Sequence, residues 1–447
     1  MTDDARPAMS DGQPTIAAPH EPGTRQADVL VCGGGVAGTM AAVAAARRGA
    51  TTLLLERYGF LGGNATAGAV AQFNGWQTAG GRRVVAGLAA EVVERLRRYG
   101  AAGEHHRFVM STGHRMDRVE YAPEMLKLVL DEMVSEAGVQ PLLHASLLAV
   151  QRSARRIDAV QVLTRGGMLA VRPRVVVDAS GEMEAMKLAG AEFLALDEGE
   201  TLQPATMMFR FGPVAFPRFE AMTPAERERL ARQGFEQGRL ARPALHAARD
   251  PYSDDAWFNI SRLAIDASDA FALGRAEIEG RRQAWCAAEY LRACVPGCER
   301  GHLVAFGTQL GVRETRRVRG LHLLTAEELL EPTAFADAIA AGAYPIDIHA
   351  ASGGGLEFAA LGDDHAYGIP FRSLVPCGLD NALVAGRGLS ATHRALAAVR
   401  VMTISMALGQ AAGTAAALAA AQQGSHVGQI PIERLRGILQ ADGACLA

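Results

Sequence analysis

The chain has 447 residues, 49% of them hydrophobic, which is enough for two or three domains with a large core. Its 45 basic and 48 acidic side chains give a formal net charge of −3, without a long run of either sign. This balance argues against nucleic acid or an anionic membrane as the main partner. The six scattered cysteines form no CxxC pair and no metal-ligand spacing, so we expect no metal site and reduced thiols in a cytoplasmic protein.

The first elements predict a strand–helix–strand unit. Residues 1–26 are polar and lack an apolar segment, which is typical of a disordered tail. The strand DVLVC follows at 28–32, then an alanine-rich helix that ends at Gly49, and then the strand TTLLLE at 51–56. A crossover this short returns the chain in the same direction, so a parallel sheet is implied.

The next elements are two amphipathic helices and a group of strands. The helices are expected over 84–101 and 121–139. The stretch 141–182 predicts four strands, with the sequence RGG as a hairpin turn between the second and third.

The second half of the chain changes character and then changes back. The stretch 191–360 is mixed, which indicates a substrate-facing domain, and its helical patterns fall at 223–240, 275–295 and 325–341. A buried strand NALVAG and a helix of small residues at 401–424 then resume the first pattern. Arginine and glycine interrupt the alanine-rich run that ends in this helix, so a buried helix explains it better than a membrane span.

These elements predict an α/β fold: a Rossmann-like dinucleotide-binding domain with a β-meander and an inserted α+β substrate domain. The expected division is a tail, the binding domain, a substrate or cap domain, a return segment and a C-terminal tail, over 1–26, 27–190, 191–360, 361–425 and 426–447.

A glycine cluster at the first strand–helix turn predicts a dinucleotide site. Gly33, Gly35 and Gly38 have the GxGxxG spacing. The first permits a tight turn, the second lets a pyrophosphate approach the backbone, and the third lets helix and strand pack closely. The N–H groups of Val36 and Ala37, at the start of the helix, would face the anion.

Residues further along favour FAD over NAD. Glu56 ends the second strand at the distance where a carboxylate accepts from ribose hydroxyls, and Arg57 after it is a weak hint of a 2′-phosphate. Three stretches of small residues, FLGGNATAG, VVVDASGE and ALVAGRGLS, stand at strand ends or in loops, where ligands collect in such sheets. The helix 402–421 would point its positive end at the flavin.

The chain resembles a family of FAD-dependent oxidoreductases with a glutathione-reductase-like FAD domain. That family is related to the flavin subunit of heterodisulfide reductase and, more distantly, to fumarate reductase flavoproteins. The matching stretches are 29–68, 175–191, 311–320, 344–350 and 367–419. The chain lacks the CxxC and four-cysteine cluster motifs of the heterodisulfide reductase subunits. Iron–sulfur electron transfer and disulfide reduction are therefore not expected.

The resemblance implies FAD as the cofactor and assigns residues to it. They would hold the pyrophosphate, the ribose, the flavin side and the two later strand ends: Gly33, Gly35, Gly38, Glu56, Gly62, Gly63, Asn64, Gly181, Gly386 and Arg387. We add Gly409, because the small-residue helix that contains it is of the kind that packs closely on a sheet or a cofactor.

The reacting end needs a base and cations, and the matching stretches supply candidates. They are Arg313, His349, Tyr367, His393 and Arg400. For His393, a site role and a capping or supporting role stay equally open. Arg313 belongs to the stretch RETRR, which more often forms a salt-bridge lattice than a substrate clamp. His349 and Tyr367 flank a glycine-rich loop that could move as a lid.

The sequence therefore predicts an FAD-dependent dehydrogenase or oxidase that abstracts hydride from a small organic substrate. A flavin-dependent monooxygenase is the alternative, and a non-enzymatic flavin- or NAD-binding module is disfavoured. The substrate, the electron acceptor and the oligomeric state, a homo-oligomer included, stay open.

Overall fold

The computed structural model describes residues 23–110, 112–350 and 355–447. Most of the predicted N-terminal tail, and the glycines of the predicted lid loop at 353–354, lie outside these residues. The first strand, β1 (Gly23–Cys32), begins earlier than predicted. Residues 23–26 are strand and not tail, because they continue the parallel pairing with a later strand, from Gly23 opposite Leu169.

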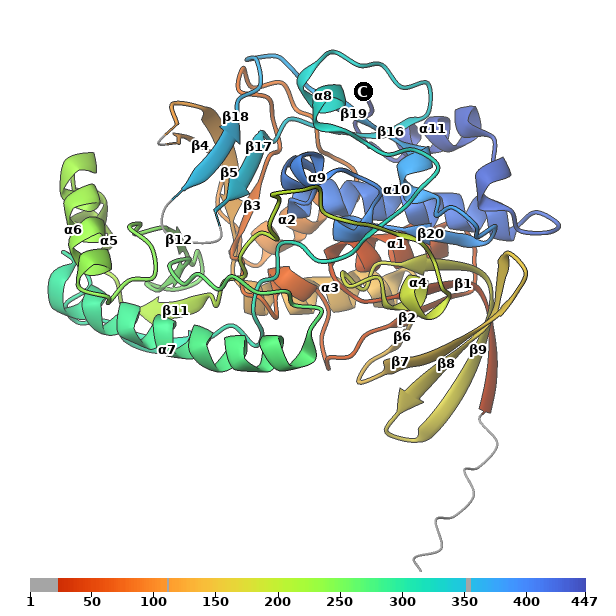
Figure 1. Ribbon diagram of the computed structural model, residues 1–447, viewed down its shortest axis with the longest axis horizontal. Coiled ribbons are helices and arrows are strands. Elements are labelled where there is room, and N and C mark those ends of the chain that lie inside the picture. Colours follow the sequence, from red (N-terminus) through yellow and green to blue (C-terminus); the bar gives the residue numbers. More distant parts are fainter. Residues whose placement is uncertain (1–22, 111, 351–354) are drawn as a thin grey trace, which may run out of the picture.

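The main sheet has a parallel half. β1 lies between β2 (Thr52–Leu55) and β9 (Gly167–Asp178), and β6 (Gln140–Leu142) and β20 (Ala382–Val384) pair with β2 and β9. The helix α1 (Val36–Arg47) connects β1 to β2 and packs on both. The α/β fold with a Rossmann-like βαβ unit is therefore confirmed (Figure 1).

The other half of this sheet is an antiparallel meander of β7 (Ser146–Ser153), β8 (Arg156–Thr164) and β9. β8 pairs with β9 as far as Val171, and β20 takes its place from Val176 onward. The four strands predicted for 141–182 are present. The RGG turn, however, joins the third to the fourth, because Ala154 with φ 49° makes the earlier turn between β7 and β8.

A second hydrophobic core lies between Ala205 and Leu310. It is built on a four-stranded antiparallel sheet in the order β12 (Ala247–Arg249), β13 (Ala256–Phe258), β11 (Phe209–Gly212) and β14 (His302–Phe306). Around this sheet pack α5 (Phe216–Glu220), α6 (Pro224–Glu236) and the long α7 (Ala270–Cys294), which form the left side of Figure 1. From Val318 onward the chain packs into the first core again.

Two further predicted elements differ from the structure. The helical pattern at 325–341 holds only for α8 (Ala326–Leu330), since Pro332 cannot continue a helix and β16 (Ala338–Gly342) follows as a strand paired with β19 (Tyr367–Pro370). The stretch 426–447 is not a bare tail. It contains α11 (Ile432–Ala441), which buries Leu435 and Leu439.

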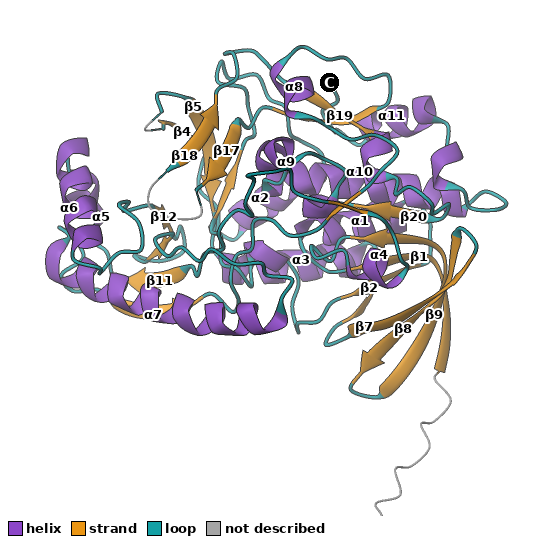
Figure 2. Ribbon diagram, viewed as in Figure 1, coloured by secondary structure: helices purple, strands orange, loops and turns teal. Residues whose placement is uncertain are grey.

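A small sheet, a hairpin and four helices complete the described fold (Figure 2). A small sheet is formed by β3 (Gln72–Asn74), β5 (Arg115–Glu120) and β4 (His106–Val109). A hairpin is formed by β17 (Ile346–His349) and β18 (Leu356–Ala359). The helices α2 (Leu88–Arg98), α3 (Pro123–Glu136) and α4 (Glu184–Leu188) complete the first core together with α9 (His393–Val399).

The last long helix, α10 (Met402–Ala420), is apolar and long enough to cross a membrane by length and composition, but 89% of its apolar window is buried inside the protein. It packs on α1 backbone to backbone. A Cβ added at Gly409 would lie 2.1 Å from the Ala37 carbonyl oxygen, and one at Gly413 would lie 2.0 Å from that of Ala41. The small residues of α10 therefore let it pack closely on α1.

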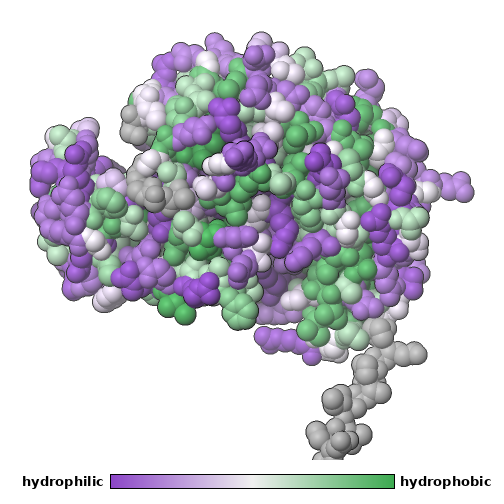
Figure 3. Space-filling view, in the orientation of Figure 1, coloured by the Kyte–Doolittle hydropathy of each residue, from purple (hydrophilic) through white to green (hydrophobic). Residues whose placement is uncertain are grey.

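On the face of the molecule drawn in Figure 3, hydrophobic and hydrophilic side chains are interspersed.

Candidate functional site

Four chain segments leave the parallel sheet at one edge. Cys32 pairs with Leu55 on one side and with Asp178 on the other, and Asp178 pairs with Val384. The residues that follow these strand ends are therefore neighbours in space. The carboxyl ends of parallel strands are the place where α/β sheets bind ligands.

The glycine turn has the geometry that its spacing predicts. Gly33 has φ 96°, and a Cβ there would lie 2.4 Å from the Ser180 backbone. At Gly38 a Cβ would lie 1.8 Å from the Gly33 carbonyl oxygen. At Gly35 the nearest atom to an added Cβ is the Gly63 Cα, 3.9 Å away, so this position opens into free space.

That space is one large cavity of about 1530 Å³. It exceeds the roughly 300–1,000 Å³ of an ordinary ligand pocket, so a cofactor and a second ligand fit together. Most of the predicted site residues line it: Gly33, Gly35, Val36, Ala37, Glu56, Arg57, Gly63, Asn64, Gly181, Arg313, His349, Arg387 and Arg400.

The other predicted residues stand behind the cavity wall. Gly38 and Gly409 are packing contacts of α1, and Gly62 and Gly386, at φ 110° and 81°, shape the loops next to their lining neighbours. These four are positioning residues, not wall residues.

Two predicted catalytic residues are also set back from the cavity. Tyr367 is 1% exposed, and its hydroxyl donates to the Tyr344 carbonyl oxygen at 3.0 Å, so the hydroxyl is engaged inside the core. His393 is buried with Nδ1 2.9 Å from Glu314 Oε1, and Glu314 Oε1 also lies 3.6 Å from Arg317 Nε. The residues of the RETRR stretch therefore have two different environments. Glu314 and Arg317 form buried charged contacts together with His393, while Arg313 lines the cavity.

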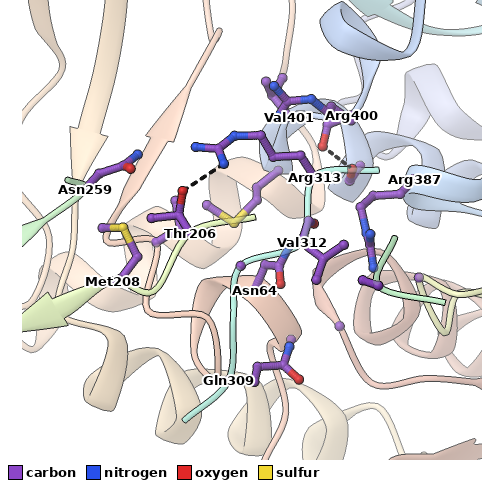
Figure 4. A pocket seen from close by; sticks show the side chains of 18 of the residues that line it. Asn64, Thr206, Met208, Asn259, Gln309, Val312, Arg313, Arg387, Arg400 and Val401 are labelled. Carbon is purple, nitrogen blue, oxygen red and sulfur yellow. Dashed lines mark hydrogen bonds between the residues drawn. The ribbon is translucent and has the colours of Figure 1, made fainter. Parts of the chain in front are cut away.

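Arg313 projects into the cavity from the segment between β14 and β15 (Arg317–Val318) (Figure 4). Its Nη1 donates to Thr206 Oγ1 at 2.8 Å and to the Pro204 carbonyl oxygen at 2.5 Å. Burial, together with the nearby charges of Arg400 and Arg242, lowers the pKa of Arg313 to about 9. Arg400, at the end of α9, donates to Gln203 Oε1 at 3.0 Å.

Asp347 and His349 alternate with Ile346 and Ile348 on β17, so the two polar side chains share the face toward the cavity. The Tyr344 hydroxyl donates to Asp347 Oδ2 at 3.0 Å, and His349 Nε2 lies 3.7 Å from the same oxygen. Burial and then the charge of Arg313 hold the pKa of His349 far below its usual range. His349 is therefore neutral at ordinary pH.

A family profile described as FAD dependent oxidoreductase matches residues 28–439. The chain belongs to this FAD-dependent oxidoreductase family. The match spans both cores and every lining segment described above, so FAD is the cofactor of this protein. The finer relation to heterodisulfide reductase or fumarate reductase is not part of that match. No curated protein matches the chain.

Two solved structures are similar to this FAD-dependent oxidoreductase at low identity. A geranylgeranyl bacteriochlorophyll reductase-like protein from Thermoplasma acidophilum is 13% identical with a TM-score of 0.48, covering 94% of this chain and 84% of its own. The p-nitrophenol 4-monooxygenase of Pseudomonas putida is 11% identical with a TM-score of 0.45, covering 94% and 81%. At these values the likeness says nothing about substrate or reaction.

The lining residues of the FAD-dependent oxidoreductase fit the pyrophosphate of its cofactor. No side chain of the described residues caps the N-terminus of α1 or α10, and both ends face the cavity through Val36 and Met402. Free N–H groups would favour the pyrophosphate at α1 and the negative charge of reduced flavin at α10. Arg387 pairs with Glu182 at 2.8 Å, and its Nη1 is buried without a partner among the described residues. A phosphate oxygen would satisfy that nitrogen.

Glu56 fits the ribose role less simply than its position in the sequence indicates. Its Oε2 accepts from the Gly34 N–H at 2.7 Å and its Oε1 from the Tyr58 N–H at 2.9 Å. Both oxygens thus already hold the glycine turn and the following loop in place. Because the carboxylate also lines the cavity, it has lone pairs left for a ribose hydroxyl.

Several lining residues escaped sequence reasoning. Arg242, His246 and Arg262 come from the poorly patterned 191–300 stretch, where no motif marks them in an arginine-rich chain. Tyr344 lies inside a stretch that resembles the family. Its position three residues before Asp347 was the sequence signal that could have marked it as a site residue. Gln309 Oε1 accepts from Arg57 Nη2 and from the Tyr58 hydroxyl, each at 2.8 Å, and so ties the second core to the adenosine side.

Arg57 is engaged by Gln309 and lies over the Tyr58 ring at 5.2 Å. Its guanidinium therefore has a protein partner without a 2′-phosphate. Within the described ranges, no group of three or more His, Cys, Asp or Glu side chains could hold a metal ion.

Proposed function

We propose that this FAD-dependent oxidoreductase removes a hydride from a small organic substrate bound in the arginine-lined half of the cavity. The observation that carries the proposal is the continuity of the cavity: the same space is lined by the glycine turn, by buried arginines and by a neutral histidine. A site for redox chemistry on carbon needs these three elements, namely a cofactor cradle, a substrate holder and a proton acceptor.

When bound, FAD supplies the hydride acceptor. The protein's own residues divide the remaining work. Arg313 and Arg400 bind and orient the substrate, since both line the cavity and each is held in place by a neutral oxygen.

We assign the proton acceptor to His349, because its imidazole lines the cavity and its Nε2 lies 3.7 Å from the Asp347 carboxylate, whose charge favours the protonated form. Asp347 stabilises the imidazolium that forms. Tyr344 keeps its proton, because burial and the Asp347 charge raise the pKa of its phenol, and its hydrogen bond orients the Asp347 carboxylate. Tyr344 and Asp347 are thus positioning residues for His349.

The test is anaerobic reduction of the bound flavin, measured by loss of its visible absorption, with a panel of small organic substrates and no nicotinamide. Bleaching by a substrate alone supports dehydrogenation. Rapid bleaching by NADPH alone, with no bleaching by any organic substrate, would instead assign the chain to the monooxygenases. A homo-oligomeric state and a cytoplasmic location stay predictions.

A further inference from the structure

Two arginines that line the cavity are anchored on consecutive residues of one segment. Arg400 Nη2 donates to Gln203 Oε1 at 3.0 Å. Arg313 Nη1 donates to the carbonyl oxygen of the next residue, Pro204, at 2.5 Å, and to Thr206 Oγ1 at 2.8 Å (Figure 4). These acceptors are neutral oxygens, and within the described ranges neither arginine forms an ion pair with a carboxylate. The bonds therefore fix both guanidinium groups without cancelling their charge.

An acidic side chain stands next to this pair. Arg400 Nη2 also lies 3.5 Å from the Asp347 backbone carbonyl oxygen. Asp347 is 5% exposed and lines the cavity, and its Oδ2 accepts from the Tyr344 hydroxyl. Oδ1 of Asp347 is buried with no hydrogen-bond partner among the described residues, and the same holds for Nε of Arg400. An unsatisfied acceptor and an unsatisfied donor thus lie in the same part of the cavity.

These two atoms suit a ligand that accepts at one end and donates at the other. A carboxylate accepts from guanidinium groups through both of its oxygens, which fits Arg313 and Arg400. A hydroxyl or an amine donates, which fits Asp347 Oδ1. Because Arg400 contacts the backbone of Asp347 itself, the accepting and donating groups of the ligand should be adjacent, as they are in a 2-substituted carboxylic acid.

Charge distinguishes a hydroxyl from an amine at this position. Arg313 and Arg400 carry two positive charges and Asp347 carries one negative charge, so one positive charge of this group has no counter-charge. The anion of a hydroxy acid supplies one negative charge, whereas the zwitterion of an amino acid supplies no net charge. Charge of one sign is costly in a buried site unless charge of the other sign joins it. A hydroxy acid is therefore the better match.

We infer that the substrate is a 2-hydroxy acid, whose carboxylate is bound by Arg313 and Arg400 and whose hydroxyl donates to Asp347 Oδ1. This inference rests on the proposed function, because it names the substrate class of that site. Loss of a hydride from the hydroxyl-bearing carbon to the bound FAD, and of the hydroxyl proton through Asp347 to His349, turns the acid into a 2-oxo acid. His349 Nε2 lies 3.7 Å from Oδ2 of the same carboxylate, so the proton has an acceptor within the site.

The experiment compares matched ligands on the FAD-loaded enzyme without oxygen. The hydroxy acids are glycolate, lactate and mandelate. Each is matched with the acid that lacks the hydroxyl (acetate, propionate, phenylacetate), with its own amide, and with the amino acid of the same skeleton (glycine, alanine, phenylglycine). Binding is read from the perturbed visible spectrum of the flavin, or from the half-saturating concentration of the bleaching rate where a ligand bleaches it.

At least one hydroxy acid should bind about tenfold or more tightly than its three matched compounds, since each of them lacks one charge-assisted hydrogen bond or adds a positive charge. This comparison uses the wild-type protein and depends on no variant. Equal binding of every hydroxy acid and its matched acid would overturn the inference. Tighter binding of the amide or of the amino acid would overturn it as well.

Two variants separate the two contacts. Arg400→Gln should weaken a hydroxy acid and its matched acid alike, by about 10- to 100-fold, and keep the ratio between them. Asp347→Leu should abolish that ratio, so that both acids bind equally. The control is Arg319→Gln, whose arginine pairs with Glu192 outside the cavity lining, and it should change neither acid. A preference for the hydroxyl that survives in Asp347→Leu would overturn the assigned contact.

The results also separate this inference from the proposed function. A hydroxy acid that binds with the expected preference but never bleaches the flavin, alongside NADPH that does, leaves the ligand class standing and refutes the hydride abstraction. Bleaching by other organic substrates, with no hydroxy acid bound, does the opposite.

Discussion

Asp347 and His349 lie two residues apart on β17, and His349 Nε2 is 3.7 Å from Asp347 Oδ2. The period of the strand puts both side chains on the cavity face, while Ile346 and Ile348 anchor the opposite face in the core. This arrangement places a neutral imidazole, supported by a carboxylate, among buried arginines.

Replacing His349 should therefore slow the chemistry and spare the cofactor. We expect His349→Gln to lower the anaerobic rate of flavin reduction by about 10²- to 10⁴-fold, the usual contribution of a general base, with FAD content unchanged. The measurement is single-turnover reduction followed in the visible flavin band. His302→Gln, on the exposed end of β14, is the control. A rate within twofold of the wild type would remove His349 from the mechanism.

His246 should make the protein acid-sensitive. Its ring lies 3.0 Å from Gln72 Nε2, and burial followed by the charge of Arg242 lowers its pKa from 6.5 to about 3. Between these values the unfolded chain binds a proton that the folded chain does not, so the free energy of unfolding falls as pH drops from about 6.5 toward 3. Denaturant unfolding at a series of pH values should show a shallower decline for His246→Gln. An identical decline would contradict the assignment.

Two glycines of the turn should have separable roles, Gly35 in binding FAD and Gly38 in the packing of the fold. A side chain at Gly35 meets open cavity, so Gly35→Val should fold normally and lose FAD. A side chain at Gly38 meets the Gly33 carbonyl, so Gly38→Val should lower the free energy of unfolding by about 1–3 kcal/mol or more. The measurements are flavin stoichiometry and denaturant unfolding, with Gly274→Ala on exposed α7 as the control. Normal flavin content in Gly35→Val would refute the pyrophosphate position.

Much of the fold and of the cofactor half was predictable because its signals are local. The spacing of Gly33, Gly35 and Gly38 encodes a strand, a turn and a helix within a few residues. The failures come from interactions that are distant in sequence. The helical pattern ends before Pro332, and the residues of β16 form a strand because β19, distant in sequence, pairs with them. In the main sheet, β20 pairs with the part of β9 that β8 no longer reaches.

The substrate half was predictable only in part. Arg313, His349 and Arg400 stood in stretches that resemble the family, and the structure places all three in the cavity lining. Arg242 and Arg262 belong to loops of the second core, and only the fold brings them to the cavity. Tyr367 was predicted and Tyr344 was not. Tyr344 lines the cavity and its hydroxyl donates to Asp347, whereas the Tyr367 hydroxyl donates to the Tyr344 carbonyl oxygen inside the core.

Arg387 should contribute to cofactor affinity through its unpaired nitrogen. Arg387→Gln is expected to weaken FAD binding about 10- to 100-fold, since a charge-assisted bond to phosphate is lost and Glu182 is left without its partner. The affinity is measured by adding FAD back to the stripped protein. Arg372→Gln, whose arginine pairs with Asp337 outside the cavity, should bind FAD like the wild type, and equal affinity in both variants would exclude a phosphate contact.

The central claim is that this FAD-dependent oxidoreductase takes a hydride directly from a small organic substrate. The most direct measurement is anaerobic titration of the FAD-loaded enzyme with a panel of small organic substrates, charged and uncharged, followed by the visible absorption of the flavin. The account predicts stoichiometric bleaching by at least one of them without NADPH, and no bleaching by that compound in His349→Gln on the same timescale. Full bleaching by NADPH alone, with every organic substrate inert, would contradict it.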